Sequence, residues 1–104
     1  MFAVIYRFKV KEEYEKDFIQ AWREMTLLIY QFEGSLGSRL HRESENTFIA
    51  YAQWPDKFTF NNSGSKLPES AKLISQRMRA SCENISTLHK METHEDLLQS
   101  EVHS

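Results

Sequence analysis

Few side chains in this sequence could do acid-base chemistry, and His41 is the best placed of them. Histidine titrates near physiological pH, so a neutral imidazole at this position could accept the proton of a phenol. His41 lies in a stretch that alternates as a β-strand, on the same side as Arg39 and opposite Leu40. The pattern leaves two alternatives open: a catalytic base, or a residue on an interface between two copies of the chain.

The other histidines and the single cysteine do not form a metal-binding pattern. His89, His94 and His103 are scattered, and no pair has metal-site spacing with a carboxylate or cysteine nearby. Cys82 cannot form an internal disulfide, and no basic residue or histidine is placed to activate its thiol. Phosphate-binding loops, nucleophile elbows and dinucleotide fingerprints are also missing from the sequence. We therefore expect no metal site, and neither kinase, hydrolase nor nicotinamide-dependent chemistry.

The composition indicates one small domain with a real core. The chain has 104 residues, of which 40% are hydrophobic, and its net charge is -2. Basic and acidic residues are interleaved, so no basic stripe for nucleic acid is formed. The longest apolar run is far shorter than the roughly 20 residues that cross a bilayer, and no export signal is visible. We expect a cytoplasmic protein without nucleic-acid or membrane partners.

Hydrophobic periodicity predicts the elements that must position these residues, beginning with a strand and a long helix. Residues 2–10 alternate between apolar and mixed positions, as in a strand. From about residue 11 onward the apolar residues recur at spacings of three and four, which predicts one buried stripe of a helix. Gly34 suits the left-handed conformation that ends a helix, so the helix is expected to stop there.

A hairpin is predicted next. Residues 35–42 and 47–54 have strand patterns, and the short polar loop between them contains Asn46, which tolerates a positive φ. Pro55 ends the second strand because it cannot donate a ladder hydrogen bond. Asp56 is placed to cap a short helical turn that follows.

The remaining pattern completes a β-α-β-β-α-β order. A second helix is predicted over about residues 68–81 and a fourth strand over residues 85–92. This order favours an α+β fold of the ferredoxin-like type, with both helices on one face of an antiparallel sheet. We expect one domain over residues 1–93 and a polar C-terminal tail over residues 94–104.

Both sides of the predicted strands carry bulky apolar groups. Ile5 lies on the side opposite Phe8, and Ile49 lies on the side opposite Phe48. Because the two helices cover only one face of the sheet, the other face needs a cover. A second copy of the chain, packed sheet against sheet, is the simplest cover, so we expect a homodimer.

Several segments resemble the antibiotic biosynthesis monooxygenase family. They are FAVIYRF at residues 2–8, EGSLGS at residues 33–38 and YAQWP at residues 51–55, together with the long first helix. The resemblance covers about residues 1–92 and implies a dimeric α+β barrel. Members include cofactor-independent monooxygenases that oxidise aromatic, quinol-like substrates with dioxygen, and others without known activity.

The resemblance also implies a site. A histidine or asparagine often follows the tryptophan-ending strand in this family, and Asn61 or Asn62 is the nearest match. The catalytic residues would then be Asn62, His41 and Trp54. Oxygenation without a cofactor needs an apolar, aromatic-lined pocket, because the substrate itself supplies the electrons. The predicted substrate-binding residues are Tyr6, Trp22, Arg39, Phe48, Phe58 and Phe60, although each aromatic residue could instead be plain core.

Haem degradation, which more distant relatives perform, is disfavoured. Those relatives carry an asparagine where Tyr6 stands and a histidine on the second helix, where residues 69–81 contain none.

Two functional hypotheses follow. The first is a monooxygenase acting on a small aromatic or quinol-like molecule. The alternative is a non-catalytic dimeric module that holds a small ligand or has a stress-related role. A pocket of several hundred Å³ with a polar group directed into it would favour the enzyme. A cavity filled by Trp22, Phe58 and Phe60 would favour the module.

Overall fold

A computed structural model describes residues 1–99, and this part of the chain has the predicted β-α-β-β-α-β order with one additional short helix. The elements are β1 (Phe2–Val10), α1 (Glu15–Glu33), β2 (Gly37–Ser44), β3 (Thr47–Trp54), α2 (Lys57–Asn61), α3 (Ser70–Ala80) and β4 (Cys82–Glu92). None of the helices among these residues is long and apolar enough to span a membrane.

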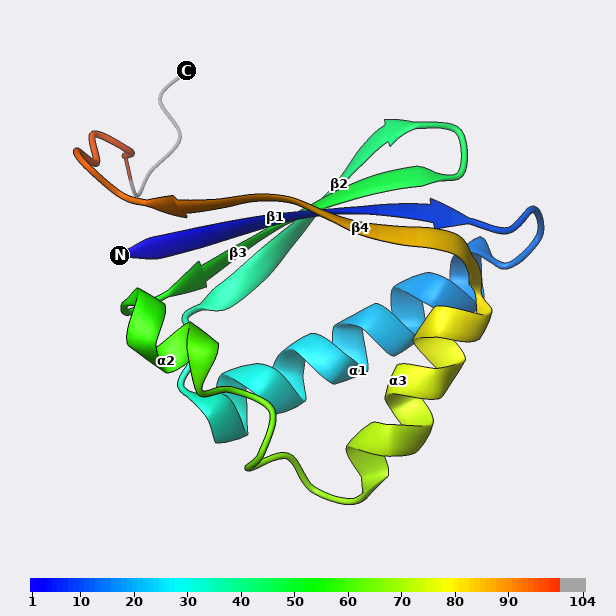
Figure 1. Cartoon of the computed structure of the whole chain (residues 1–104). Coiled ribbons are helices and arrows are strands. Elements are labelled where there is room, and N and C mark those ends of the chain that lie inside the picture. Colours follow the sequence, from blue (N-terminus) through cyan, green and yellow to red (C-terminus); the bar gives the residue numbers. More distant parts are fainter. Residues whose placement is uncertain (100–104) are drawn as a thin grey trace.

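The four strands form one antiparallel sheet in the order β2-β3-β1-β4. Helices α1 and α3 lie on the same face of this sheet, and no helix covers the opposite face (Figure 1). This arrangement confirms the ferredoxin-like α+β fold. It gives the sheet a helix-covered face and an uncovered face, which we call the open face.

Local backbone signals explain where the elements end. Helix α1 starts at Glu15, later than expected, because a turn with Glu13 at φ 72° precedes it. It ends at Gly34, which has the predicted left-handed conformation with φ 80°. In the hairpin, Asn46 takes φ 59°, and β2 extends to Ser44, so the turn is shorter than predicted.

The capping of α2 also follows the prediction. The Asp56 carboxylate accepts a hydrogen bond from the Thr59 backbone N–H at 2.7 Å. This bond, together with one from the Thr59 hydroxyl, lowers the pKa of Asp56. The short helix therefore begins where the strand-ending Pro55 leaves the sheet.

The core lies between the helices and the sheet. Phe18 of α1 is fully buried, with its ring centroid 5.0 Å from that of Phe8 and 5.4 Å from that of Phe48. A second cluster lies toward the other end of the sheet and contains Phe2, Val4, Ala52 and Trp54. These aromatic contacts fix α1 on the sheet.

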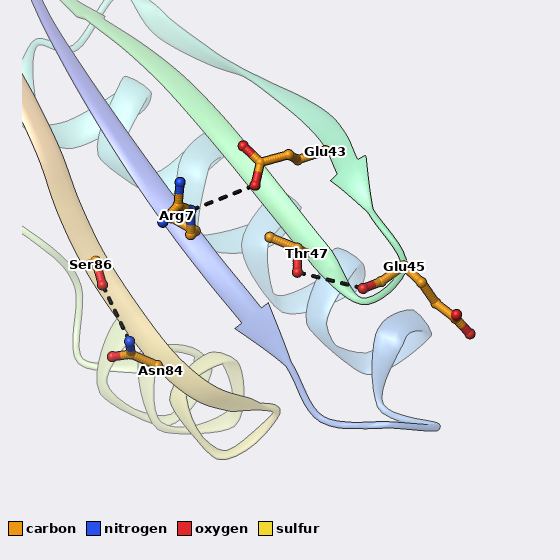
Figure 2. A network of polar contacts seen from close by, with 6 residues as sticks. All are labelled: Arg7, Glu43, Glu45, Thr47, Asn84 and Ser86. Carbon is orange, nitrogen blue, oxygen red and sulfur yellow. Dashed lines mark hydrogen bonds and ion pairs between the residues drawn. The ribbon is translucent and has the colours of Figure 1, made fainter.

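The open face combines apolar and charged side chains. Cross-strand pairing places Ile5 beside Tyr51, and His41 beside Ile49, on this side of the sheet. Figure 2 shows Arg7 reaching across β3 toward Glu43, with Arg7 Nε and Glu43 Oε1 3.7 Å apart. The buried Arg7 Nε has no hydrogen-bond partner within residues 1–99.

Strand β4 begins earlier than expected, because Cys82 already pairs with Val10. After it, the Thr93 backbone N–H donates to the Met1 carbonyl oxygen at 2.8 Å. Residues 94–99 of the predicted tail form no helix or strand. Residues 100–104 of that tail, including His103, lie outside the described residues.

Candidate functional site

A cavity of about 450 Å³ lies between helices α1 and α3 and the helix-covered face of the sheet. Every strand contributes to it, as do both long helices, whose position below the sheet is visible in Figure 1. Its volume falls in the usual range for small-molecule sites. The lining residues are Tyr6, Phe8, Trp22, Met25, Thr26, Ile29, Ser35, Ser38, Ala50, Ala52, Trp54, Ser75, Met78, Arg79, Ile85 and Thr87.

Trp54 is the most informative of the lining residues. It is the last residue of β3, it is 4% exposed, and its Nε1–H has no hydrogen-bond partner within residues 1–99. Leaving a buried donor unpaired costs about 1–3 kcal/mol. A ligand that places an acceptor oxygen beside this nitrogen would recover that energy.

The Trp54 indole is held in place by aromatic neighbours. The ring of Phe60 from α2 meets it edge-on, with centroids 5.5 Å apart and an interplanar angle of 70°. The ring centroids of Phe60 and Phe2 are also 5.5 Å apart, and Lys90 Nζ lies 5.5 Å from the centroid of the Phe60 ring. These contacts restrict the rotation of the indole, so the direction of its N–H is fixed before any ligand enters.

Helix α2 and the segment after it are attached to the end of α1 by Glu33. This residue is 6% exposed, and its Oε2 accepts hydrogen bonds from the backbone N–H groups of Gly64 and Lys66. Gly64 takes φ 112°, a conformation that other residues rarely adopt. The Glu33 carboxylate therefore holds the connection between α2 and α3 against the body of the domain.

The electrostatics of the cavity favour a neutral or anionic ligand. Burial raises the pKa of the Tyr6 phenol above its usual value of 10.0, so at neutral pH this group is a hydrogen-bond donor. Among residues 1–99, Arg79 of α3 is the single charged residue in the lining, to which these residues contribute no carboxylate and no histidine. A positive charge at the wall lowers the pKa of a nearby phenol.

Three of the predicted site residues line this cavity: Tyr6, Trp22 and Trp54. Phe48 lies instead in the core, packed against Phe18. Phe60 lies behind Trp54, and Phe58 is 75% exposed on α2. The aromatic wall of the cavity is thus smaller than expected, and helix α2 supports it from behind.

The predicted polar residues lie elsewhere. Asn62 is exposed at the end of α2, where its Nδ2 donates to the Phe58 carbonyl oxygen at 2.8 Å. His41 is exposed on the open face, and Arg39 borders a shallow hollow of about 150 Å³ on β2 and β3. Their roles in catalysis or binding stay predictions, because these three side chains are not brought to the cavity.

Several lining residues were not predicted as part of a site. Met25, Ile29 and Met78 belonged to the predicted buried stripes of the two helices, and Arg79 directly follows one of them. Arg79 is an exposed residue on α3. In the sequence, only its position next to Met78 indicated that it could lie near the cavity. The small residues of β3 were a further signal, since alanines between two large aromatic residues leave space.

The described residues contain no group of three or more histidine, cysteine or carboxylate side chains that could hold a metal ion. Burial raises the pKa of the Cys82 thiol to about 11, so the thiol is protonated at neutral pH and is a poor nucleophile. The side-chain donors of the described lining residues are therefore the indole N–H groups of Trp22 and Trp54, hydroxyl groups and one guanidinium group.

Comparison with known proteins gives one family and one fold. The family model for antibiotic biosynthesis monooxygenases matches residues 1–64. SnoaB, a cofactor-independent oxygenase from Streptomyces nogalater, superimposes with a TM-score of 0.75 at 15% identity, covering 94% of this chain and 97% of SnoaB. No match was found among curated proteins.

Two further solved structures have the same fold. An antibiotic biosynthesis monooxygenase gives a TM-score of 0.71 at 17% identity, covering 91% of this chain and 100% of that protein. A NIPSNAP domain protein from Burkholderia xenovorans gives a TM-score of 0.72 at 11% identity, covering 95% of this chain and 100% of that protein. At such identities the likeness establishes the fold, and the chemistry must be argued from the site.

Proposed function

This chain belongs to the antibiotic biosynthesis monooxygenase family, and we propose that it is a cofactor-independent monooxygenase that oxidises a small aromatic or quinol-like molecule with dioxygen. The observation that carries the proposal is Trp54, which lines the 450 Å³ cavity and whose buried Nε1–H has no hydrogen-bond partner within residues 1–99. An aromatic ligand with a carbonyl or phenolic oxygen satisfies both the apolar lining and this donor. SnoaB, whose fold is similar to that of this chain, is a cofactor-independent oxygenase.

Each lining group then has a task. Trp54 Nε1–H donates to a substrate oxygen, and the Tyr6 phenol, whose pKa is raised by burial, is protonated and can donate as well. Arg79 stabilises the ionised phenol or enol that must form before dioxygen reacts. The apolar wall excludes water from that reactive species.

The reaction balances without an added reductant. A substrate methylene next to an aromatic ring loses its two hydrogens, dioxygen supplies one oxygen atom to the new carbonyl, and the second oxygen atom leaves as water. The substrate carbon is oxidised and dioxygen is reduced. The protein has to bind and orient the substrate, favour its ionised form, and admit dioxygen.

The alternative is a non-catalytic module that binds a small ligand in the same cavity. One observation favours it: the lining contains no histidine or carboxylate that could serve as a base. The cavity is open rather than filled, since Phe58 is exposed and Phe60 lies outside its lining, and this suits either function. We favour the enzyme because Arg79 in the lining can stabilise an ionised phenol.

We also propose that the protein works as a cytoplasmic homodimer. The open face carries Ile5 and Ile49 with no helix above them (Figure 1), and a second copy would cover both. Arg7 Nε lies 3.7 Å from Glu43 Oε1 but has no hydrogen-bond partner within residues 1–99, and it would find an acceptor in the partner. Ile49→Asp should convert the dimer to a monomer in light scattering, and a monomeric unmodified protein would disprove the proposed assembly.

Oxygen consumption tests the proposed activity. The purified, metal-stripped protein is mixed with a panel of hydroquinones and anthrones, and oxygen uptake is followed with and without added flavin. We expect protein-dependent uptake that needs neither flavin nor metal, and a several-fold slower rate in Trp54→Phe. Uptake that is absent with every compound, although the compounds bind, would support the binding module instead.

A further inference from the structure

The side chains of β3 that face the helices change abruptly in size along the strand. Phe48 and Trp54 stand at its two ends, and Ala50 and Ala52 lie between them. All four are buried, with Ala52 the most exposed at 9%. Phe48 packs in one core cluster with Ala50, and Trp54 packs in the other with Ala52. Both alanines and Trp54 also line the cavity, and we call the two alanines its floor.

The floor continues onto the neighbouring strand. Ser38 of β2 pairs with Ala52 and also lines the cavity. Its hydroxyl donates to the Tyr51 carbonyl oxygen at 3.0 Å, so the side chain is tied to the sheet instead of extending into the cavity. Three small side chains therefore lie side by side on strands that are about 4.8 Å apart.

The opposite wall is made of longer side chains from α1, among them Met25 and Ile29. A methionine changes shape at little cost, because it has three rotatable bonds and a polarizable sulfur. The sheet backbone under the alanines cannot adapt in this way. The depth of the cavity is therefore set by the floor rather than by the helix.

We infer that Ala50 and Ala52 are specificity-determining residues: their methyl groups leave the depth in which a flat, fused-ring ligand lies on β3 beside Trp54. The inference rests on the proposed function only for the aromatic nature of the ligand. A larger side chain at either position would occupy the space of the additional rings. The site would then hold single-ring molecules only.

A simple packing role for these alanines is a different explanation, and the structure offers a contrast. Ala21 of α1 is fully buried and does not line the cavity, so a larger side chain there would collide with the core. Ala52 lines the cavity and is 9% exposed, whereas Ala50 lines it with only 1% of its surface exposed. A larger side chain at position 52 can extend into that space, and it should leave the fold intact.

The test compares ligand size between variants by equilibrium dialysis. Methylhydroquinone is the single-ring probe and dihydroxyanthraquinone is the fused-ring probe. Ala52→Leu should weaken binding of the fused-ring probe by about 10- to 200-fold, the range for added methylenes in a pocket, and should change binding of the single-ring probe much less. Ala52→Val should give the same selectivity to a smaller degree, and it replaces Ala52→Leu in the test if the leucine variant unfolds.

Ala80→Leu is the matched control, because Ala80 is exposed at the end of α3 and lies outside the cavity lining. It should bind both probes as the unmodified protein does. The inference would be overturned if Ala52→Leu and Ala52→Val lose binding of both probes equally, or lose binding of neither. It would also be overturned if the unmodified protein binds neither probe. Binding is read separately from oxygen uptake, so size selection without oxygen consumption would contradict the proposed activity alone.

Discussion

Helix α1 lies on one face of the sheet (Figure 1), and its two ends meet different surroundings. Near its start, Phe18 is fully buried between Phe8 and Phe48, with ring centroids 5.0 and 5.4 Å away. Near its end, Ile29 borders the cavity whose floor is Ala50 and Ala52. We call these regions the Phe18 end and the Trp54 end.

The difference shows how one layer of helix on sheet can serve both stability and binding. Large aromatic side chains from both layers pack together at the Phe18 end, although one of them, Phe8, also lines the cavity. At the Trp54 end the strand carries alanines, and Trp54 packs edge-on against Phe60. The Phe18 end should therefore carry stability, and the Trp54 end should carry binding.

The largest expected effect comes from truncation at the Phe18 end. Phe18→Ala should lower the free energy of unfolding by about 3–5 kcal/mol, because it removes a fully buried ring and leaves a cavity. Chemical denaturation measures this loss. Phe32→Ala, on the same helix but at a side chain that is 40% exposed, is the control and should cost less than about 1 kcal/mol. Similar losses in both variants would remove the distinction between the two ends.

A smaller effect is expected at Glu33, which anchors the segment behind the Trp54 end. Glu33→Ala leaves the N–H groups of Gly64 and Lys66 without their acceptor, so it should cost about 1–3 kcal/mol. Hydrogen exchange of those two amides should become faster, while the amides of β1 stay protected. Glu33→Gln keeps an acceptor oxygen and should lose less. Unchanged exchange in Glu33→Ala would show that the carboxylate does not hold the segment.

The smallest effect concerns Tyr6, whose pKa is raised by burial above 10.0. The folded protein binds this proton more tightly than the unfolded chain, so stability is unaffected below about pH 10 and falls as the pH rises through the raised pKa. Ultraviolet titration should show one tyrosine ionising late, and Tyr6→Phe should remove that step. An ordinary Tyr6 titration would mean that water already fills the Trp54 end.

Much of the fold could be predicted because its signals are local. Each of these signals depends only on neighbouring residues. They are the alternation along β1, the left-handed backbone conformation of Gly34 and Asn46, and the capping of α2 by Asp56. Strand β4 was predicted to start late, because the residues around Cys82 and Ile85 are polar, and only pairing with β1 makes them a strand.

The site could be predicted less well, for a physical reason. Strand alternation assigns a residue to one face of the sheet, but it does not say where along that face a helix packs closely. Phe48 and Trp54 share a face, yet Phe48 lies under Phe18 and Trp54 lies beside the cavity. Phe58 and Phe60 are two residues apart on a helix and therefore point in different directions. The unpaired state of Trp54 Nε1 depends on all of its neighbours at once.

The central claim is that the Trp54 end binds an aromatic ligand through the Trp54 indole N–H, and a nuclear magnetic resonance titration tests it directly. The chain has two tryptophans, so two indole N–H signals are expected, and Trp54→Phe assigns them. Addition of dihydroxyanthraquinone should move the Trp54 signal to lower field and slow its exchange with solvent, as a new hydrogen bond requires. A Trp54 signal that keeps its position and its exchange rate at saturating ligand would contradict the account.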